Sequence, residues 1–296
     1  AQSAVPLIER YGGKVLKRRT VSQILIKNGK AYGVKAHQSS GSENLSEEEY
    51  YAPIVISGTG AAQTYSKLIP KEIKIPFRDE LKNPEGISAF CVYVTLKTSP
   101  ETLGVQGENH WVFDGITQYE SEDENGFIRG YYLSFPSLKN PEAKSHTADI
   151  INFVRYKHFG KWKDSSWKNR SEDYEHFKNE MAKKLIAKVN QRIPGFAELV
   201  ESVEVSTPLT IEHFLNCEKG IFYGMPMVPS RLFKPWTHAK TPVRNLLLTG
   251  TDVMTPGVVG AMTGGLKTAG VVVGSFGVFR IMKKIQQSVH RQKQEL

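Results

Sequence analysis

The sequence has few cysteines and gives no sign of a disulfide framework. Among its 296 residues, only Cys91 and Cys217 are cysteines, and they lie far apart in no pair motif. Such usage fits a reducing compartment or a chain that does not depend on disulfides. We expect both cysteines to be small buried hydrophobes rather than nucleophiles.

The sequence also lacks the pattern of a targeting or membrane-spanning segment. Residues 1–11 show no charged-then-apolar signal and begin without methionine. They read as the middle of a domain, so we expect a fragment or a processed product. Towards the other end, Lys267 divides an apolar segment into runs shorter than the roughly 20 residues that a membrane helix needs.

Familiar catalytic and metal-binding motifs are missing. The sequence contains no His-Glu-x-x-His and no Gly-x-Ser-x-Gly, and its eight histidines are scattered. The stretch 260–268 approaches a phosphate-binding loop, but Leu266 separates Gly265 from Lys267. We therefore predict no metal site and assign no catalytic residue.

Acidic residues are fewer than basic ones, 30 against 39, which gives a net charge of +9. This balance suits nucleic acid, an anionic membrane surface or an acidic ligand. Nucleic acid is not expected, because zinc-finger spacing and an aromatic RNA-binding signature are absent. The basic tail 280–296 follows the apolar Phe276 and Phe279. It is either a solvated helix end or a peripheral attachment to the cytoplasmic face of a membrane.

Short runs rich in β-branched residues indicate many strands. Residues 20–27 and 31–36 flank Asn28-Gly29, a strong hairpin signal because both residues tolerate positive φ. An acidic loop is expected at 118–125. Further strands are expected at 14–16, 50–57, 89–96, 111–114, 131–135, 149–157, 201–206 and 245–249.

One helix is well marked by an apolar stripe in which residues recur every three or four positions. The stripe consists of Tyr174, Phe177, Met181, Leu185, Val189 and Ile193. Ser171 is the expected N-cap, and Pro194-Gly195 ends the helix. Shorter elements are expected at 5–11 and 63–68 (helices), 207–210 (a turn) and 211–215 (a helix).

The segment 245–265 is the one that suggests a binding site. A short apolar strand runs into Gly250, where the backbone must turn sharply or approach another group closely. Asp252 follows at the carboxyl end of the strand, where α/β sheets place ligands. The alternative is an ordinary strand-turn-helix with an aspartate in its turn.

A glycine-rich helix is expected over residues 256–279, with Thr255 as N-cap and Pro256 at the first position. Gly257 and Gly260 leave the first turn with little bulk, so a ligand can reach its N–H groups, whose partial positive charge stabilises an anion. Four further glycines follow, Gly264, Gly265, Gly270 and Gly274. Each costs about 1 kcal/mol relative to alanine, which indicates close packing against another backbone or a flat ligand.

This segment resembles the C-terminal flavin motif of the phytoene desaturase, carotenoid isomerase and retinol saturase family, in which a strand ends in Leu-Thr-Gly-x-Asp before a glycine-containing helix. The matching residues are Leu248, Thr249, Gly250, Asp252, Gly257, Gly260 and Ala261. Weaker similarities follow in family order at 7–15, 33–34 and 53–57. The stretch 206–224 is most similar to the retinol saturase branch.

The resemblance implies an FAD-dependent oxidoreductase. In it, Asp252 would hydrogen-bond the ribityl chain, and the amides of residues 257–259 would face the pyrimidine edge of the flavin. Val21 would lie near the adenosine, and residues 57–60 near the ligand crevice. The expected cofactor-binding residues are Val21, Ser57, Gly58, Gly60, Gly250, Asp252, Pro256, Gly257, Val258 and Val259.

The implied fold class is mixed α/β: the C-terminal portion of a glutathione-reductase-like FAD-binding domain with an inserted mixed-sheet substrate domain. The expected parts are 1–66 (middle of the FAD-binding domain), 67–236 (substrate-binding domain), 237–279 (closing strand and helix) and 280–296 (basic tail). The family's Gly-x-Gly-x-x-Gly is incomplete, because Gly58-Thr59-Gly60 lacks the third glycine. We interpret it as a strand-end loop and expect the pyrophosphate-binding portion upstream of Ala1.

Three functions remain open at this point. The first is an enzyme that saturates, desaturates or isomerises the conjugated double bonds of a retinoid or carotenoid, with NAD(P) as a candidate electron source. The second is a non-catalytic flavoprotein remnant that binds lipid or a partner chain, which the missing fingerprint favours. The third, an amine-oxidising flavoenzyme, needs an aromatic pair facing the flavin that we cannot place. The oligomeric state is undetermined.

Overall fold

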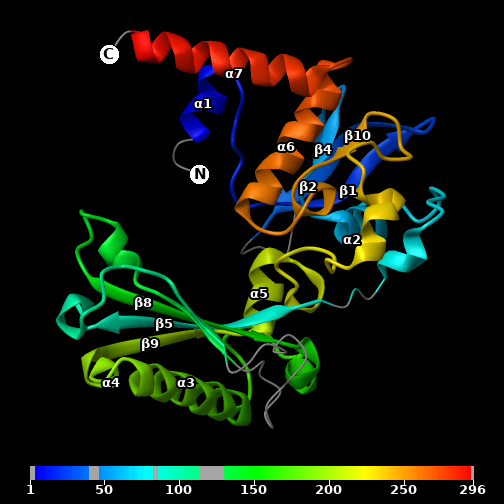
Figure 1. The fold of residues 1–296 in the computed structure, drawn as a ribbon. Coiled ribbons are helices and arrows are strands. Elements are labelled where there is room, and N and C mark those ends of the chain that lie inside the picture. Colours follow the sequence, from blue (N-terminus) through cyan, green and yellow to red (C-terminus); the bar gives the residue numbers. More distant parts are fainter. Residues whose placement is uncertain (1–3, 40–46, 83, 85, 114–129, 295–296) are drawn as a thin grey trace. The chain divides into compact units, whose positions relative to one another are not determined.

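The computed structural model describes residues 4–39, 47–82, 84, 86–113 and 130–294, so the predicted acidic loop at 118–125 lies outside the described residues (Figure 1). The chain divides into two compact units. Unit 1 comprises residues 1–82 and 227–296, and unit 2 comprises residues 83–226. The mixed α/β class expected from the sequence is confirmed.

Two stretches that we assigned to the substrate-binding domain, residues 67–82 and 227–236, lie in unit 1. They are joined to each other by an ion pair between Lys234 Nζ and Glu80 Oε2, which lie 2.7 Å apart. The roles proposed for the parts of the chain stay predictions.

Unit 1 contains an antiparallel sheet of β1 (Arg19–Lys27), β2 (Lys30–Gln38) and β3 (Glu48–Tyr51), in that order. The hairpin turn lies at Asn28 and Gly29, whose φ angles are 52° and 69°, as the sequence predicted. Residues 14–16, predicted as a strand, form none, and Val15 and Leu16 are exposed.

A separate two-stranded parallel sheet pairs β4 (Val55–Ser57) with β10 (Leu246–Leu248). The single strand predicted at 50–57 is therefore wrong: its first part belongs to β3 and its last part to β4. Pro53 lies between the two strands. Proline has no N–H to donate to a ladder, which explains why the strand is interrupted there.

Figure 1 shows α6 beside these sheets and α7 continuing from its end. The α-helices are α1 (Val5–Arg10), α2 (Ala61–Gln63), α6 (Val258–Val273) and α7 (Gly277–Gln294). A π-helix, η1 (Thr64–Leu68), continues α2. Short 3-10 turns are η2 (Arg78–Leu81), η7 (Pro229–Phe233), η8 (Pro235–Thr237) and η9 (Thr251–Val253).

The single glycine-rich helix predicted at 256–279 is also wrong, because the chain forms two helices there. Gly274 has φ 92° and Phe276 has φ 55°, which the right-handed helix does not allow, and α6 and α7 meet at a bend of 110°. A Cβ on Gly277 would lie 2.0 Å from the Gly270 carbonyl oxygen, so the bend depends on glycine. The predicted basic tail forms most of α7.

Unit 2 is built on a five-stranded antiparallel sheet in the order β6-β7-β8-β5-β9. The strands are β5 (Ser88–Leu96), β6 (His110–Val112), β7 (Tyr131–Ser134), β8 (His146–Val154) and β9 (Val200–Ser206). The helices are α3 (Glu172–Arg192), α4 (Phe196–Leu199) and α5 (Pro208–Leu215). The 3-10 turns are η3 (Pro100–Leu103), η4 (Pro136–Lys139), η5 (Tyr156–Trp162) and η6 (Glu218–Gly220).

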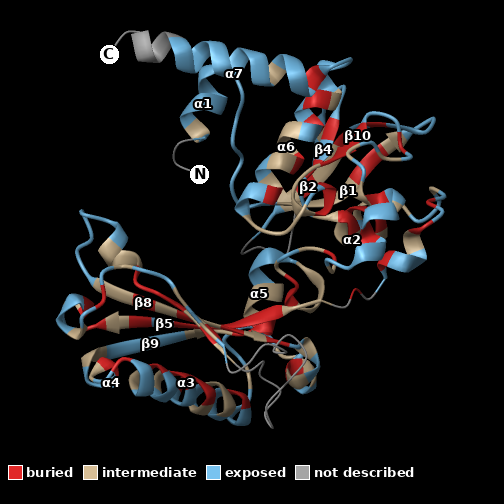
Figure 2. Cartoon of the chain, viewed as in Figure 1, coloured by how far each residue is buried: buried red, intermediate tan, exposed pale blue. Residues whose placement is uncertain are grey.

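Helix α3 packs against one face of this sheet and forms the main core (Figure 2). The predicted stripe is confirmed: Met181, Leu185 and Val189 are buried against alternate strand residues. The turn predicted at 207–210 is wrong, since Thr207 caps α5 and Pro208 is its first residue. Threonine at N-cap and proline at the first position suit a helix start.

Candidate functional site

The carboxyl ends of β4 and β10 lie side by side. Ser57 pairs with Leu248, and the Thr249 N–H donates to the Ser57 carbonyl at 2.9 Å. The loops 58–60 and 250–252 therefore leave the sheet at one edge, which is where open α/β sheets bind ligands.

A buried carboxylate ties these two loops together. Asp252, which is 2% exposed, accepts the N–H of Ala61 on Oδ2 at 2.6 Å. Arg231, also 2% exposed, brings Nη2 to 3.4 Å from Asp252 Oδ1 and donates to the Thr251 carbonyl at 2.6 Å. The Arg231 guanidinium lies 5.8 Å from the centre of the Trp236 ring. Burial lowers the pKa of Arg231, and the Asp252 carboxylate opposes that change.

The expected site residues thus fall into different settings. Asp252 is enclosed by protein partners rather than open to solvent. The Ser57 side chain is buried and lies 2.7 Å from Thr64 Oγ1, which in turn donates to the Gly60 carbonyl. Val21 lies on β1, in the other sheet of unit 1. Their assigned roles toward a cofactor stay predictions.

Helix α6 begins two residues later than predicted. Gly257, with φ 88° and ψ 173°, is the N-cap, and Thr255 and Pro256 lie in the loop before it. Thr255 instead packs beneath the helix, since a Cβ on Gly260 would lie 2.0 Å from its carbonyl oxygen. The positive φ of Gly257 prevents the helix from starting earlier.

The first turn of α6 faces open space. Within the described part of the chain, the N–H groups of Val258 and Val259 have no hydrogen-bond acceptor. Their side chains are 75% and 78% exposed, and Met262 is 70% exposed. A helix start with unsatisfied donors carries partial positive charge. The arrangement can hold an anionic or electron-rich edge of a ligand beside an apolar surface.

The middle of α6 is anchored by glycine. A Cβ on Gly264 would lie 2.3 Å from the Gly250 carbonyl oxygen, so helix and loop touch backbone to backbone. Thr268 Oγ1 donates to the Leu248 carbonyl at 2.6 Å and fastens the helix to β10. Of the two explanations offered for these glycines, close packing against another backbone is confirmed at Gly264.

Sequence reasoning missed Arg231. It lies in a proline-rich stretch, between Pro229 and Pro235, where a basic residue reads as solvated. Its partner Asp252 is 21 residues away, so no periodicity or motif connects them. No local signal identifies this residue.

No family model matches the chain, but individual proteins of known name are similar to it. The all-trans-retinol 13,14-reductase of Danio rerio is 30% identical over 321 residues, which cover 99% of this chain and 51% of the relative. The human protein of the same name is 28% identical over 98% of this chain and 50% of its own length. Prolycopene isomerase 1 of an Oncidium hybrid is 26% identical over 90% of this chain and 43% of its own length.

These relatives confirm the resemblance to the phytoene desaturase, carotenoid isomerase and retinol saturase family that the sequence indicated. It spans about half the length of the curated relatives it matches. Two solved structures share its fold. A variant of putrescine oxidase has a TM-score of 0.52 at 13% identity, covering 93% of this chain and 52% of that one. Cyclohexylamine oxidase from Brevibacterium oxydans has a TM-score of 0.50 at 12% identity, covering 96% of this chain and 52% of that one.

Proposed function

We propose that this chain is the flavin-closing and substrate-binding part of an FAD-dependent oxidoreductase that acts on the carbon–carbon double bonds of a lipid-soluble polyene. One observation carries the proposal: α6 packs at Gly264 against Gly250, just after β10 ends, and among the described residues the amides of its first turn have no acceptor. The relatives are named for retinol reduction and prolycopene isomerisation, which favours a retinoid or carotenoid.

The residues present fit the flavin part of FAD. A Cβ on Gly257 would meet no atom within 4 Å, so no protein atom crowds this side of the helix start. The N–H groups of Val258 and Val259 would hold its electron-rich edge, and their exposed side chains would contact its face. Bound FAD would supply the hydride acceptor or donor. In this proposal Asp252 fixes the loop beside the ribityl chain.

The corresponding fold assignment is part of the same proposal. Unit 1 would be the C-terminal portion of a glutathione-reductase-like FAD-binding domain, and unit 2 would be the inserted substrate domain. The shared fold with two amine oxidases supports this division. The incomplete Gly58-Thr59-Gly60 fits a strand-end loop, since the Ala61 N–H that follows is taken by Asp252.

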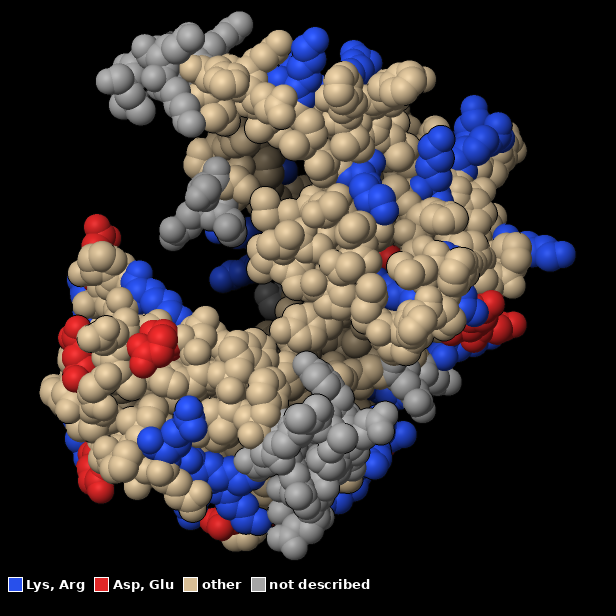
Figure 3. All heavy atoms as spheres, viewed as in Figure 1, with Lys and Arg blue, Asp and Glu red and all other residues tan. Residues whose placement is uncertain are grey.

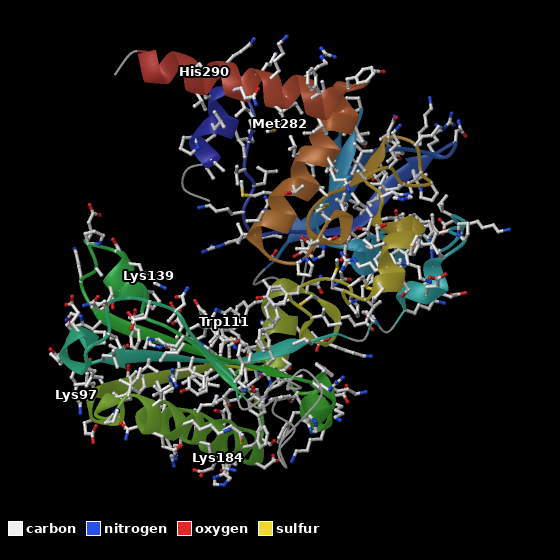
Figure 4. All side chains as sticks on the ribbon, in the orientation of Figure 1. Lys97, Trp111, Lys139, Lys184, Met282 and His290 are labelled. Atoms are coloured by element: carbon white, nitrogen blue, oxygen red, sulfur yellow. The ribbon has the colours of Figure 1, made fainter. Side chains whose placement is uncertain are left out.

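Unit 2 offers a surface suited to a polyene on the face of its sheet opposite α3. Trp111 pairs with Tyr132, and its ring stacks on Phe113 at 6.2 Å between centroids. Figure 4 shows Trp111 on this face of the unit. Asp149 and Glu204, which pair with Tyr93, lie on the same face. The aromatic part of this face, around Trp111, favours contact with an apolar conjugated chain.

Anaerobic incubation of the complete protein, with the pyrophosphate-binding portion expected upstream of Ala1, with retinoids and carotenoids, followed by flavin absorbance, tests the proposal. Bleaching or reoxidation of the bound flavin by one of these polyenes is expected. A protein that binds no flavin, or a bound flavin that responds to amines and not to polyenes, contradicts it. The comparisons give no support for NAD(P) as electron source, which stays a prediction.

A non-catalytic flavoprotein is the second candidate. One relative, 27% identical over 91% of this chain, is an inactive all-trans-retinol 13,14-reductase of Danio rerio. The enclosure of Asp252 also suits a structural role. A protein that binds FAD tightly but whose reduced flavin is never reoxidised by any polyene would favour this candidate.

Helix α7 supports peripheral membrane contact. No single helix in the described residues is long and apolar enough to cross a membrane; α6 and α7 reach that length only as a bent pair. In α7, Met282, Ile285 and Val289 form an exposed apolar face, and the helix contains five Lys or Arg and no acidic residue. Figure 3 shows basic side chains at several separate places on unit 1. Co-sedimentation with phosphatidylserine vesicles, absent with phosphatidylcholine alone, is expected.

A further inference from the structure

Arg231 is buried, whereas the residues beside it in the sequence are exposed. It lies in η7 directly before two exposed residues, Leu232 at 68% and Phe233 at 87%, while its own side chain is 2% exposed. Enclosing a guanidinium has a desolvation cost that must be offset by close partners. Two such partners are the carbonyl of Thr251 and the carboxylate of Asp252.

Through these contacts Arg231 joins three segments of unit 1. Asp252, which it contacts, also accepts the Ala61 N–H, so η7, the loop after β10 and the start of α2 meet at one carboxylate. The same loop leads within a few residues to Gly257, the N-cap of α6. The position of residues 251–252 therefore helps to set how the chain enters the helix.

We propose that Arg231 is a positioning residue for the flavin site: it holds Thr251 and Asp252 so that the open amides of α6 meet the ring edge. This inference rests on the proposed function. The contact to Thr251 is a hydrogen bond from a charged donor, a class that is stronger than neutral hydrogen bonds. Arg231 acts through the loop, and no contact between it and the flavin is needed.

A double-mutant cycle on FAD affinity tests the proposal. Arg231→Met, Asp252→Asn and the double variant are purified with bound flavin, and the dissociation constant of FAD is measured by flavin fluorescence. Loss of one charge-assisted hydrogen bond is expected to weaken FAD binding by about tenfold. If Arg231 acts through Asp252, the double variant weakens it no further than the worse single variant.

Two variants separate positioning from general loss of stability. Arg231→Lys keeps a cation beside Asp252 and is expected to restore part of the affinity, although a single ammonium cannot reproduce the guanidinium geometry. Leu185→Ala destabilises the core of unit 2 and is expected to leave the FAD dissociation constant unchanged in the folded protein. Hydrogen exchange of residues 249–261 with FAD bound is expected to rise in Arg231→Met and not in Leu185→Ala.

The outcomes are distinct. Wild-type protein that binds no FAD contradicts the proposed function and this inference with it. Wild-type protein that binds FAD, with unchanged affinity in Arg231→Met, overturns this inference alone. Unchanged hydrogen exchange of residues 249–261 in Arg231→Met would also overturn it, because it would show that Arg231 does not hold this loop.

Discussion

Helices α3 and α6 are both long, but different contacts hold them in place. Helix α3 presents a stripe of large side chains, including Leu185 and Val189, to the sheet of unit 2, and its other face is charged. Helix α6 has little charge and touches its neighbours through Gly260 and Gly264, where backbone meets backbone.

The difference explains why one helix is structural and the other is available to a ligand. Side-chain packing against the sheet covers the apolar face of α3 along its length. Close backbone contacts at Gly260 and Gly264 hold α6 in place. They leave Val258, Val259 and Met262 exposed at its start. In the loop that leads to this start, Asp252 forms a buried ion pair with Arg231.

The largest expected effect comes from breaking that ion pair. Arg231→Met leaves the buried Asp252 carboxylate without its cationic partner, and one-sided removal of a buried pair costs about 3–5 kcal/mol. Urea unfolding of the protein measures the loss. The double variant with Asp252→Asn should recover most of it. Arg192→Met, at an exposed arginine, is the control. If Arg231→Met lowers the free energy of unfolding by no more than Arg192→Met does, the pair contributes little.

Removing a large side chain from the α3 stripe comes next. Leu185→Ala leaves a cavity in a core where the residue is 3% exposed, which costs about 2–5 kcal/mol. Thermal unfolding checks it, with the exposed neighbour Lys184→Ala as a control that should change stability by less than about 0.5 kcal/mol. Equal effects of the two variants would contradict the assignment of the core.

Adding one methyl group to α6 tests the glycine contact. In Gly264→Ala the new Cβ would lie 2.3 Å from the Gly250 carbonyl oxygen, so the helix must move and about 1–3 kcal/mol is lost. The adjacent Gly265→Ala has its nearest atom at 3.9 Å and should be neutral or stabilising, by up to about 1 kcal/mol, because alanine favours helix. Similar results for both positions would contradict close packing.

The smallest effect is a gain. Tyr65 is fully buried, and within the described residues its hydroxyl has no hydrogen-bond partner. Burial raises the pKa of this phenol, so the group stays neutral but unsatisfied. Tyr65→Phe removes the unpaired hydroxyl and should stabilise unit 1 by about 1 kcal/mol. Calorimetry checks the sign, and a loss of stability would indicate a partner for the hydroxyl.

Elements with a strong local pattern were predictable. The stripe of α3 repeats within one segment, and the Asn28-Gly29 hairpin depends on two adjacent residues that accept positive φ. The strand-end segment around Asp252 was found in the same way, because a strand, a glycine and a carboxylate follow one another in sequence.

Boundaries set by distant contacts were not predictable. The start of α6 depends on the conformation of Gly257, and its end on Gly274, at positions where a helical continuation fits the local sequence equally well. The division of residues 50–57 between two sheets depends on which strands lie nearby, β2 for the first part and β10 for the second.

The sequence by itself determined the resemblance to known relatives, the mixed α/β class and the segment in which a helix start follows the end of a strand, because these depend on residues close together in the chain. Only the tertiary structure decided that Asp252 is enclosed by Ala61 and Arg231 while the amides of Val258 and Val259 stay open. Burial and the pairing of charges depend on groups far apart in sequence, and folding alone brings them together.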